Sequence, residues 1–106
     1  MIVHIASGES QSEEIDFRMC AGLAVSMPTM TGTHMGIYAC HESKGVFRPV
    51  NDTDGLIVTT VNSGEITVIS SNTFPLGFIK IASFSDAVGT LETEAAERTI
   101  VVMVKP

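Results

Sequence analysis

Arg98-Thr-Ile-Val-Val-Met-Val-Lys105 is the strongest strand signal in the sequence, and the rest of the chain supplies partners for it. Positions 100, 102 and 104 carry Ile and Val and fall on one face of such a strand, while positions 99, 101 and 103 carry Thr, Val and Met and fall on the other. Both faces are mostly apolar, which is typical of a strand inside a sheet that is covered on both sides. The sequence therefore predicts a buried central strand here.

The length and composition of the chain indicate one globular unit. A chain of 106 residues predicts a single domain spanning residues 1–106. Hydrophobic residues make up 44% and charged residues 17%, which excludes a disordered chain or a coiled coil. Five Phe, one Tyr and no Trp are present, so the core is expected to be aliphatic.

The net charge of −6 argues against binding to nucleic acid. A nucleic-acid backbone is bound by clustered Lys and Arg, whereas the six basic residues here are spread along the chain. No apolar run approaches the roughly 20 residues that a membrane helix needs. The first residues also lack the basic and apolar regions of a signal peptide. We therefore expect no nucleic-acid or membrane partner, and folding in a cytoplasm.

Short apolar runs separated by turn signals predict strands along the whole chain. Pro49 favours an edge position for its strand, a turn is expected at 51–55, and the runs at 56–61 and 65–70 are expected to form a hairpin. A loop is expected at 71–75, and a long loop or one helical turn at 86–96. The predicted strands are residues 2–5, 15–19, 22–27, 34–40, 46–50, 56–61, 65–70, 77–84 and 98–105.

Eight or nine short strands are the pattern of an all-β protein. The expected fold is a compact antiparallel β-sandwich of jelly-roll-like or Greek-key type. A doubly wound α/β fold would need several crossover helices, and no segment shows apolar residues at helical spacing over a helix's length.

The two cysteines do not form a recognisable reactive site. Cys40 and His41 are adjacent on a predicted strand, so their side chains point to opposite faces and cannot form a nucleophile–base pair. Free cysteine is among the most buried residue types, and a cytoplasm keeps thiols reduced. We expect Cys20 and Cys40 to be reduced, packed thiols.

No metal-ligand spacing is present either. His4, His34 and His41 are dispersed, without a paired motif. Asp52-Thr-Asp54-Gly55 resembles the opening of a calcium loop, but apolar residues follow immediately and a turn between strands explains it better. We expect no metal, no cofactor and no catalytic residue.

Three carboxylates precede the last strand, at Glu92, Glu94 and Glu97. Carboxylates in a loop are normally solvated, and no partner group suggests a catalytic cluster. Arg98 opens the strand and can pair with one of them, which would pin the loop against the sheet.

Three methionines flank a loop that contains a proline and a glycine. Because methionine repacks easily, two interpretations are open: an adaptable contact surface, or gap-filling in a core short of aromatic residues. Met30 lies at the loop centre, where burial within one monomer is hard to arrange. The candidate partner-contact residues are Met27, Met30, His34 and Met35.

Five segments carry a resemblance to a known group of proteins. They are Cys20-Ala-Gly-Leu-Ala-Val-Ser-Met-Pro28, Gly36-Ile-Tyr-Ala39, Val46-Phe-Arg-Pro-Val-Asn-Asp-Thr-Asp-Gly55, Phe74-Pro-Leu-Gly-Phe-Ile-Lys-Ile-Ala-Ser83 and Ala95-Ala-Glu-Arg-Thr-Ile-Val-Val-Met-Val-Lys105. Together, over about residues 21–106, they resemble small β-sandwich virion proteins of tailed bacteriophages, which are often labelled decoration, head-fibre or minor structural proteins. Typical relatives carry a Trp after the Met-Pro segment, where this chain has Thr29-Met30-Thr31.

The resemblance implies a non-enzymatic virion structural protein, foremost a capsid decoration (cement) protein that binds the head surface and stabilises capsomers. The implied partners are the major capsid protein or other virion proteins, together with further copies of the chain in a homo-oligomer, for example a trimer. The implied location is the virion, after synthesis in the host cytoplasm.

Two other classes of function remain as alternatives. One is a carbohydrate- or receptor-binding β-sandwich module of a tail or head fibre. Such sites usually stack sugars on exposed Trp or Tyr, and Tyr38 is the one such residue here. The other is an enzyme, for which the sequence assembles no nucleophile, base and oxyanion donors.

Overall fold

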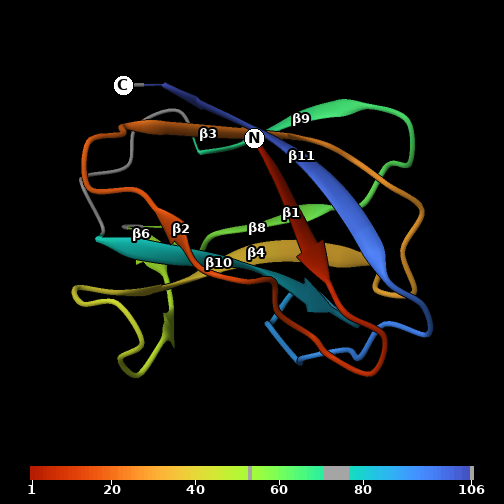
Figure 1. Ribbon diagram of the computed structural model, residues 1–106. Helices are drawn as coiled ribbons and strands as arrows, with labels where there is room; N and C mark the ends of the chain where they lie inside the picture. Colours follow the sequence, from red (N-terminus) through yellow and green to blue (C-terminus); the bar gives the residue numbers. More distant parts are fainter. Residues whose placement is uncertain (53, 71–76, 106) are drawn as a thin grey trace.

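Two antiparallel sheets stack face to face in the computed structural model, which describes residues 1–52, 54–70 and 77–105 (Figure 1). The upper sheet in that view, sheet A, has the strand order β1-β11-β3-β9. Its strands in that order are Ile2–Ile5, Arg98–Lys105, Gly22–Ser26 and Ile66–Ser70.

The lower sheet, sheet B, has the strand order β2-β10-β4-β5, and β8 also pairs with β4. Its strands are β2 (Ile15–Asp16), β10 (Phe78–Phe84), β4 (His34–Cys40), β5 (Arg48–Pro49) and β8 (Val58–Thr60). A separate two-stranded ribbon joins β6 (Asn51–Asp52) to β7 (Gly55–Leu56). The predicted all-β antiparallel sandwich is therefore confirmed.

The described residues form 11 strands, not eight or nine, because β6 and the start of β7 lie in the turn predicted at 51–55, and the segment predicted at 56–61 is divided between β7 and β8. β5 lies at the end of its sheet's strand order, as Pro49 predicts. The connection at 85–97 is loop, and none of the described residues is helical. The described part of the chain accordingly contains no helix suited to crossing a bilayer. The loop predicted at 71–75 lies outside the described residues.

The core lies between the two sheets and is mainly aliphatic, as the composition predicts. The side chains that alternate inward on β1, β3, β4, β10 and β11 meet there. Phe17, which follows β2, is the one aromatic among the described residues of this buried cluster. The buried members of this cluster are Val3, Ile5, Ile15, Phe17, Leu23, Val25, Met27, Met35, Ile37, Ile57, Ile79, Ile81, Ile100 and Val102.

The hairpin predicted from 56–61 and 65–70 is wrong. β8 pairs with β4 in sheet B, whereas β9 pairs with β3 in sheet A. The connection between β8 and β9 instead runs beside the β3–β4 connection, where Met27 N–H donates to the Glu65 carbonyl and Val61 N–H to the Thr33 carbonyl. Both connections pass from one sheet to the other together, so each strand finds its partner in the neighbouring segment.

β11 is central in its sheet, between β1 and β3, as predicted. Ile100 and Val102 are buried against sheet B. The prediction that β11 is covered on both sides is wrong, because Val101 and Met103 on its other side are exposed. The chain therefore covers one face of its central strand and leaves the other open.

Candidate functional site

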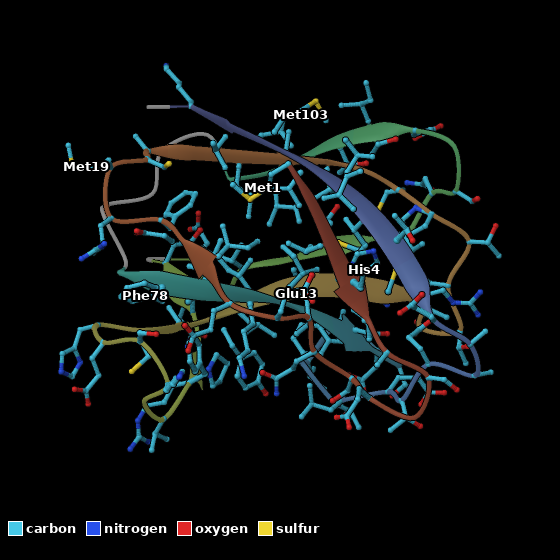
Figure 2. All side chains as sticks on the ribbon, viewed as in Figure 1. Met1, His4, Glu13, Met19, Phe78 and Met103 are labelled. Atoms are coloured by element: carbon cyan, nitrogen blue, oxygen red, sulfur yellow. The ribbon has the colours of Figure 1, made fainter. Side chains whose placement is uncertain are left out.

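The outer surface of sheet A is the candidate functional site, and we call it the A face. It consists of the side chains that alternate away from sheet B on the four strands. In Figure 2, Met103 lies above the upper sheet, on the side away from sheet B. The described positions of the A face are Ile2, His4, Gly22, Ala24, Ser26, Ile66, Val68, Thr99, Val101, Met103 and Lys105.

The strand register places apolar side chains side by side across this face. One row crosses all four strands through Ile2, Val101, Ser26 and Ile66, and the next runs through Met103, Ala24 and Val68. The exposed fractions of the five large apolar residues are 58% for Ile2, 69% for Ile66, 61% for Val68, 43% for Val101 and 38% for Met103. The outward face of a sandwich sheet normally carries polar residues. A contiguous apolar face of this kind marks an interaction surface.

The A face also differs from the rest of the molecule in charge. The chain carries 12 Asp and Glu residues, yet none occupies a described position of the A face. Its ionisable residues are His4 near one end and Lys105 at the other. Glu13, beside the β1 edge, accepts hydrogen bonds from the His4 backbone N–H at 2.7 Å and interacts with His4 Nδ1 at 3.3 Å. The described positions of the A face therefore carry no negative side chain, on a protein of net charge −6.

The outer surface of sheet B is covered by the chain itself. Phe84 is fully buried, with its ring over the backbone of Gly36 and its centroid 6.3 Å from that of Tyr38. A Cβ on Gly89 would lie 2.8 Å from the Leu56 side chain, so the 85–97 connection meets the segment that enters β8. In Figure 1 this connection, drawn in blue, lies beneath the lower sheet. Sheet B therefore has its cover within the monomer.

A buried carboxylate, Glu94, closes one end of the sandwich. Its side chain accepts hydrogen bonds from Ser83 Oγ of β10 at 2.7 Å and from Arg98 Nε of β11 at 2.8 Å. The backbone N–H groups of Thr31 and Gly32 donate to it at 2.8 and 3.0 Å. A Cβ on Gly32 would lie 2.0 Å from Ser83 Oγ, so this approach needs glycine. One carboxylate thus joins both sheets and the β3–β4 loop.

The electrostatics of Glu94 are those of a satisfied structural ion. Burial raises its pKa, but the hydrogen bond from Ser83 and the other three donors outweigh burial, so the pKa lies below its ordinary value. The prediction that Arg98 pairs with one of the three loop carboxylates is confirmed. The expectation that these carboxylates are solvated is wrong for Glu94, which is 1% exposed. The reason is that three of its four donors, Thr31, Gly32 and Ser83, come from other parts of the sequence.

The predicted contact residues around the methionine loop divide between core and surface. Met27 and Met35 are buried in the core cluster and cannot face a partner, so they fill the core instead. Met30 is partly buried and packs against the same cluster. His34 is half-buried, with Nδ1 2.9 Å from Thr33 Oγ1. Of the four predicted contact residues, Met30 and His34 therefore reach the surface, and their contact with a partner stays a prediction.

The cysteines, histidines and acidic turn have ordinary structural surroundings. Cys20 and Cys40 are both free thiols; Cys20 is half-buried and Cys40 is buried, as expected. Asp52 and Gly55 pair across the β6–β7 ribbon, and the Asp52 carboxylate accepts a hydrogen bond from the Asp54 backbone N–H at 2.8 Å. Thr53, within that predicted turn, lies outside the described residues. Across residues 1–52, 54–70 and 77–105, no three His, Cys, Asp or Glu residues gather as a metal site.

Comparisons with protein families, with curated proteins and with solved structures give no match for this chain. Sequence reasoning missed the A face as a site. The signal was present in the alternate apolar positions of Arg98–Lys105, but two apolar faces on a strand predict burial on both sides within one molecule.

Proposed function

We propose that this chain is a non-enzymatic structural protein of a tailed-bacteriophage virion, and specifically a capsid decoration (cement) protein. The observation that carries the proposal is the A face, an exposed apolar surface that a particle component would cover and that an isolated soluble protein would normally make polar. The resemblance over residues 21–106 supports the assignment to a virion. Its partners would be the major capsid protein or other virion proteins.

The architecture supports a role in which neighbours hold the chain. The core between the two sheets and the Glu94 contacts that join them make a rigid unit. A rigid unit loses little conformational freedom when it is bound, so more of its contact energy appears as affinity. Repetition of weak contacts over many equivalent capsid sites multiplies their effect.

Mass spectrometry of purified particles tests this function directly. Particles from the phage that encodes the chain should contain it in tens to hundreds of copies, as expected when many equivalent sites are occupied. Purified chain added to particles that lack it should bind them and raise the temperature at which the capsid opens. Absence of the chain from intact particles would end the proposal.

The sugar-binding alternative is less well supported. Tyr38 is half-buried and lies beside Phe84, so its ring is not free to stack on a sugar. Phe47 and Phe78 each lie beneath a cation, Lys80 Nζ at 4.6 Å and the Arg18 guanidinium at 5.0 Å from the ring centroids. A glycan array with the purified chain should therefore show no binding.

A further inference from the structure

The A face has the size of a standard protein interface. Whole residues of this size expose on the order of 200 Å², so the exposed fractions of its five large apolar residues leave roughly 500 Å² of apolar area open. The partly exposed polar residues beside them bring the face to roughly 800 Å², which is the area that each partner buries in a standard interface. The area is sufficient for a specific complex and exceeds what a chance contact covers.

The chemistry of the A face favours a second copy of the same chain as its partner. Two copies of a protein of net charge −6 repel each other over most of their surfaces. The repulsion is smallest where no carboxylate is present, and the described positions of the A face have none. Apolar sheet faces are also self-complementary, since two sheets pack about 10 Å apart with their side chains interdigitated.

The ends of the A face are also compatible with pairing. Lys105 lies at one end of the face, opposite Gly22. Glu13 lies at the other end, where it contacts His4; both are labelled in Figure 2. Consider a two-fold axis that lies in the plane of the interface and perpendicular to the strands. The strands of the two copies then run in opposite directions. That arrangement sets Val101 of one copy over Met103 of the other and brings the basic end of each copy over the end with Glu13.

We propose that the A face is the interface of a homodimer, in which two copies pack face to face about a two-fold axis. The dimer completes the cover that β11 lacks in the monomer, so each central strand is buried on both sides as its sequence predicts. This inference deepens the proposed function and rests on it only for the role of the chain in an assembly: the component that covers the A face is a second copy, so the capsid contacts other surfaces of the dimer. The unit added to the particle is then a dimer with its acidic surfaces outward.

Analytical ultracentrifugation of the whole chain tests the dimer. The concentration series should run from about 1 µM to about 300 µM, which covers the affinities expected for a modest interface. A reductant must be present throughout, because the half-buried thiol of Cys20 could link two copies covalently. The sedimenting mass should rise from that of the 11.3 kDa monomer to twice that value. A monomer at every concentration, or a trimer, overturns the proposal.

Matched variants assign the interface. Val101→Asp places like charges in the centre of the paired faces and should weaken the dimer at least about tenfold. Val46→Asp makes the same chemical change at a residue that is 71% exposed beside β5, and should leave the dimer unchanged. Val68→Lys, on the edge strand β9, is the second variant and should also weaken the dimer. Circular dichroism checks that each variant is folded. A dimer unaffected by Val68→Lys and Val101→Asp would place the interface elsewhere.

The dimer and the virion role fail in different experiments. A chain found in particles but monomeric in solution overturns the dimer and leaves the virion role standing. A dimer formed through the A face by a chain that particles lack overturns the virion role and leaves the dimer standing.

Discussion

β10 and β11 are the central strands of the two sheets, yet their outward sides have opposite surroundings. Every outward side chain of β10 is either buried or in contact with another side chain of the same chain. Ala82 and Phe84 are fully buried. Phe78 lies under the Arg18 guanidinium, and the Lys80 ammonium lies over the Phe47 ring. On β11, by contrast, Thr99, Val101 and Met103 are exposed.

The difference shows that the connecting segments of this chain cover sheet B rather than sheet A. Leu56, just before β8, meets Gly89 of the 85–97 connection, which lies beneath sheet B in Figure 1. No described segment lies over the A face in the same way. The described residues thus cover the outer side of sheet B, whereas they leave an apolar surface open on sheet A, which we propose is covered by a second copy.

The largest expected effect separates the covered strand from the open one. Phe84→Ala removes a fully buried ring and should lower the free energy of unfolding by about 3–5 kcal/mol. Met103→Ala removes a side chain of the A face that is already partly in water, and should cost about 1 kcal/mol or less. Urea unfolding followed by circular dichroism, at a concentration below dimer formation, measures both. Similar losses for the two variants would contradict the contrast between the faces.

The second effect tests the contact that holds the two sheets together. Glu94→Gln keeps the shape of the side chain but removes the charge that Ser83, Arg98 and the loop backbone donate to. It should lower the free energy of unfolding by about 2–3 kcal/mol, because hydrogen bonds to charged groups are strong. Glu97→Gln is the matched control, since Glu97 is exposed in the same loop, and should change stability by less than about 0.5 kcal/mol.

The Glu94 carboxylate should make the free energy of unfolding depend on pH. The folded pKa of Glu94 lies below its ordinary value of 4.5, so its ionised form is favoured in the folded state. Its contribution is therefore fully present above about pH 4.5 and is lost as the pH falls through the lower folded pKa. Unfolding curves between about pH 7 and pH 3 should show a smaller loss of stability for Glu94→Gln than for the unmodified chain. Parallel pH profiles for the two proteins would argue that Glu94 does not carry this dependence.

The sequence predicts local strands well and long-range partners poorly. Ile2–Ile5, His34–Cys40 and Arg98–Lys105 appear with their predicted bounds, because each alternates or is apolar over its whole length. The hairpin at 56–70 is predicted from two strand-like runs with a short turn signal between them, but both of its arms pair with distant strands instead. Turn residues determine where the chain bends, but they do not determine which strands pair with each other.

Neither the burial of Glu94 nor the exposure of the A face could be predicted from the sequence, for a related reason. The donors to Glu94 lie at residues 31, 32, 83 and 98, so its burial depends on a loop, two strands and their packing. The A face exists because the segments that connect the strands cover one apolar sheet face and leave the other exposed. Alternation in β11 therefore identified the residues but could not say which side the monomer leaves open.

A third effect tests how closely the cover of sheet B is fitted. Gly36 lies under Phe84, and a Cβ added to it would lie 2.5 Å from the ring and 2.7 Å from the Ile57 carbonyl oxygen. Gly36→Ala should therefore force a shift and cost about 1–3 kcal/mol of unfolding free energy, as overpacking does. Thermal unfolding by circular dichroism measures it, with Ala24→Ser on the A face as a nearly neutral comparison. A loss below about 0.5 kcal/mol would show that the cover is loosely packed.

The smallest effect on the monomer is expected on the A face itself. Ile66 is 69% exposed on the edge strand β9, so most of its side chain is already in contact with water. Ile66→Thr keeps a β-branched residue that suits a strand, and should change the unfolding free energy of the monomer by less than about 0.5 kcal/mol. The same substitution removes apolar area from the paired faces, so it should weaken self-association measured by ultracentrifugation. A variant that destabilises the monomer while leaving association intact would mean that Ile66 supports the sandwich and that the A face is not an interface at this strand.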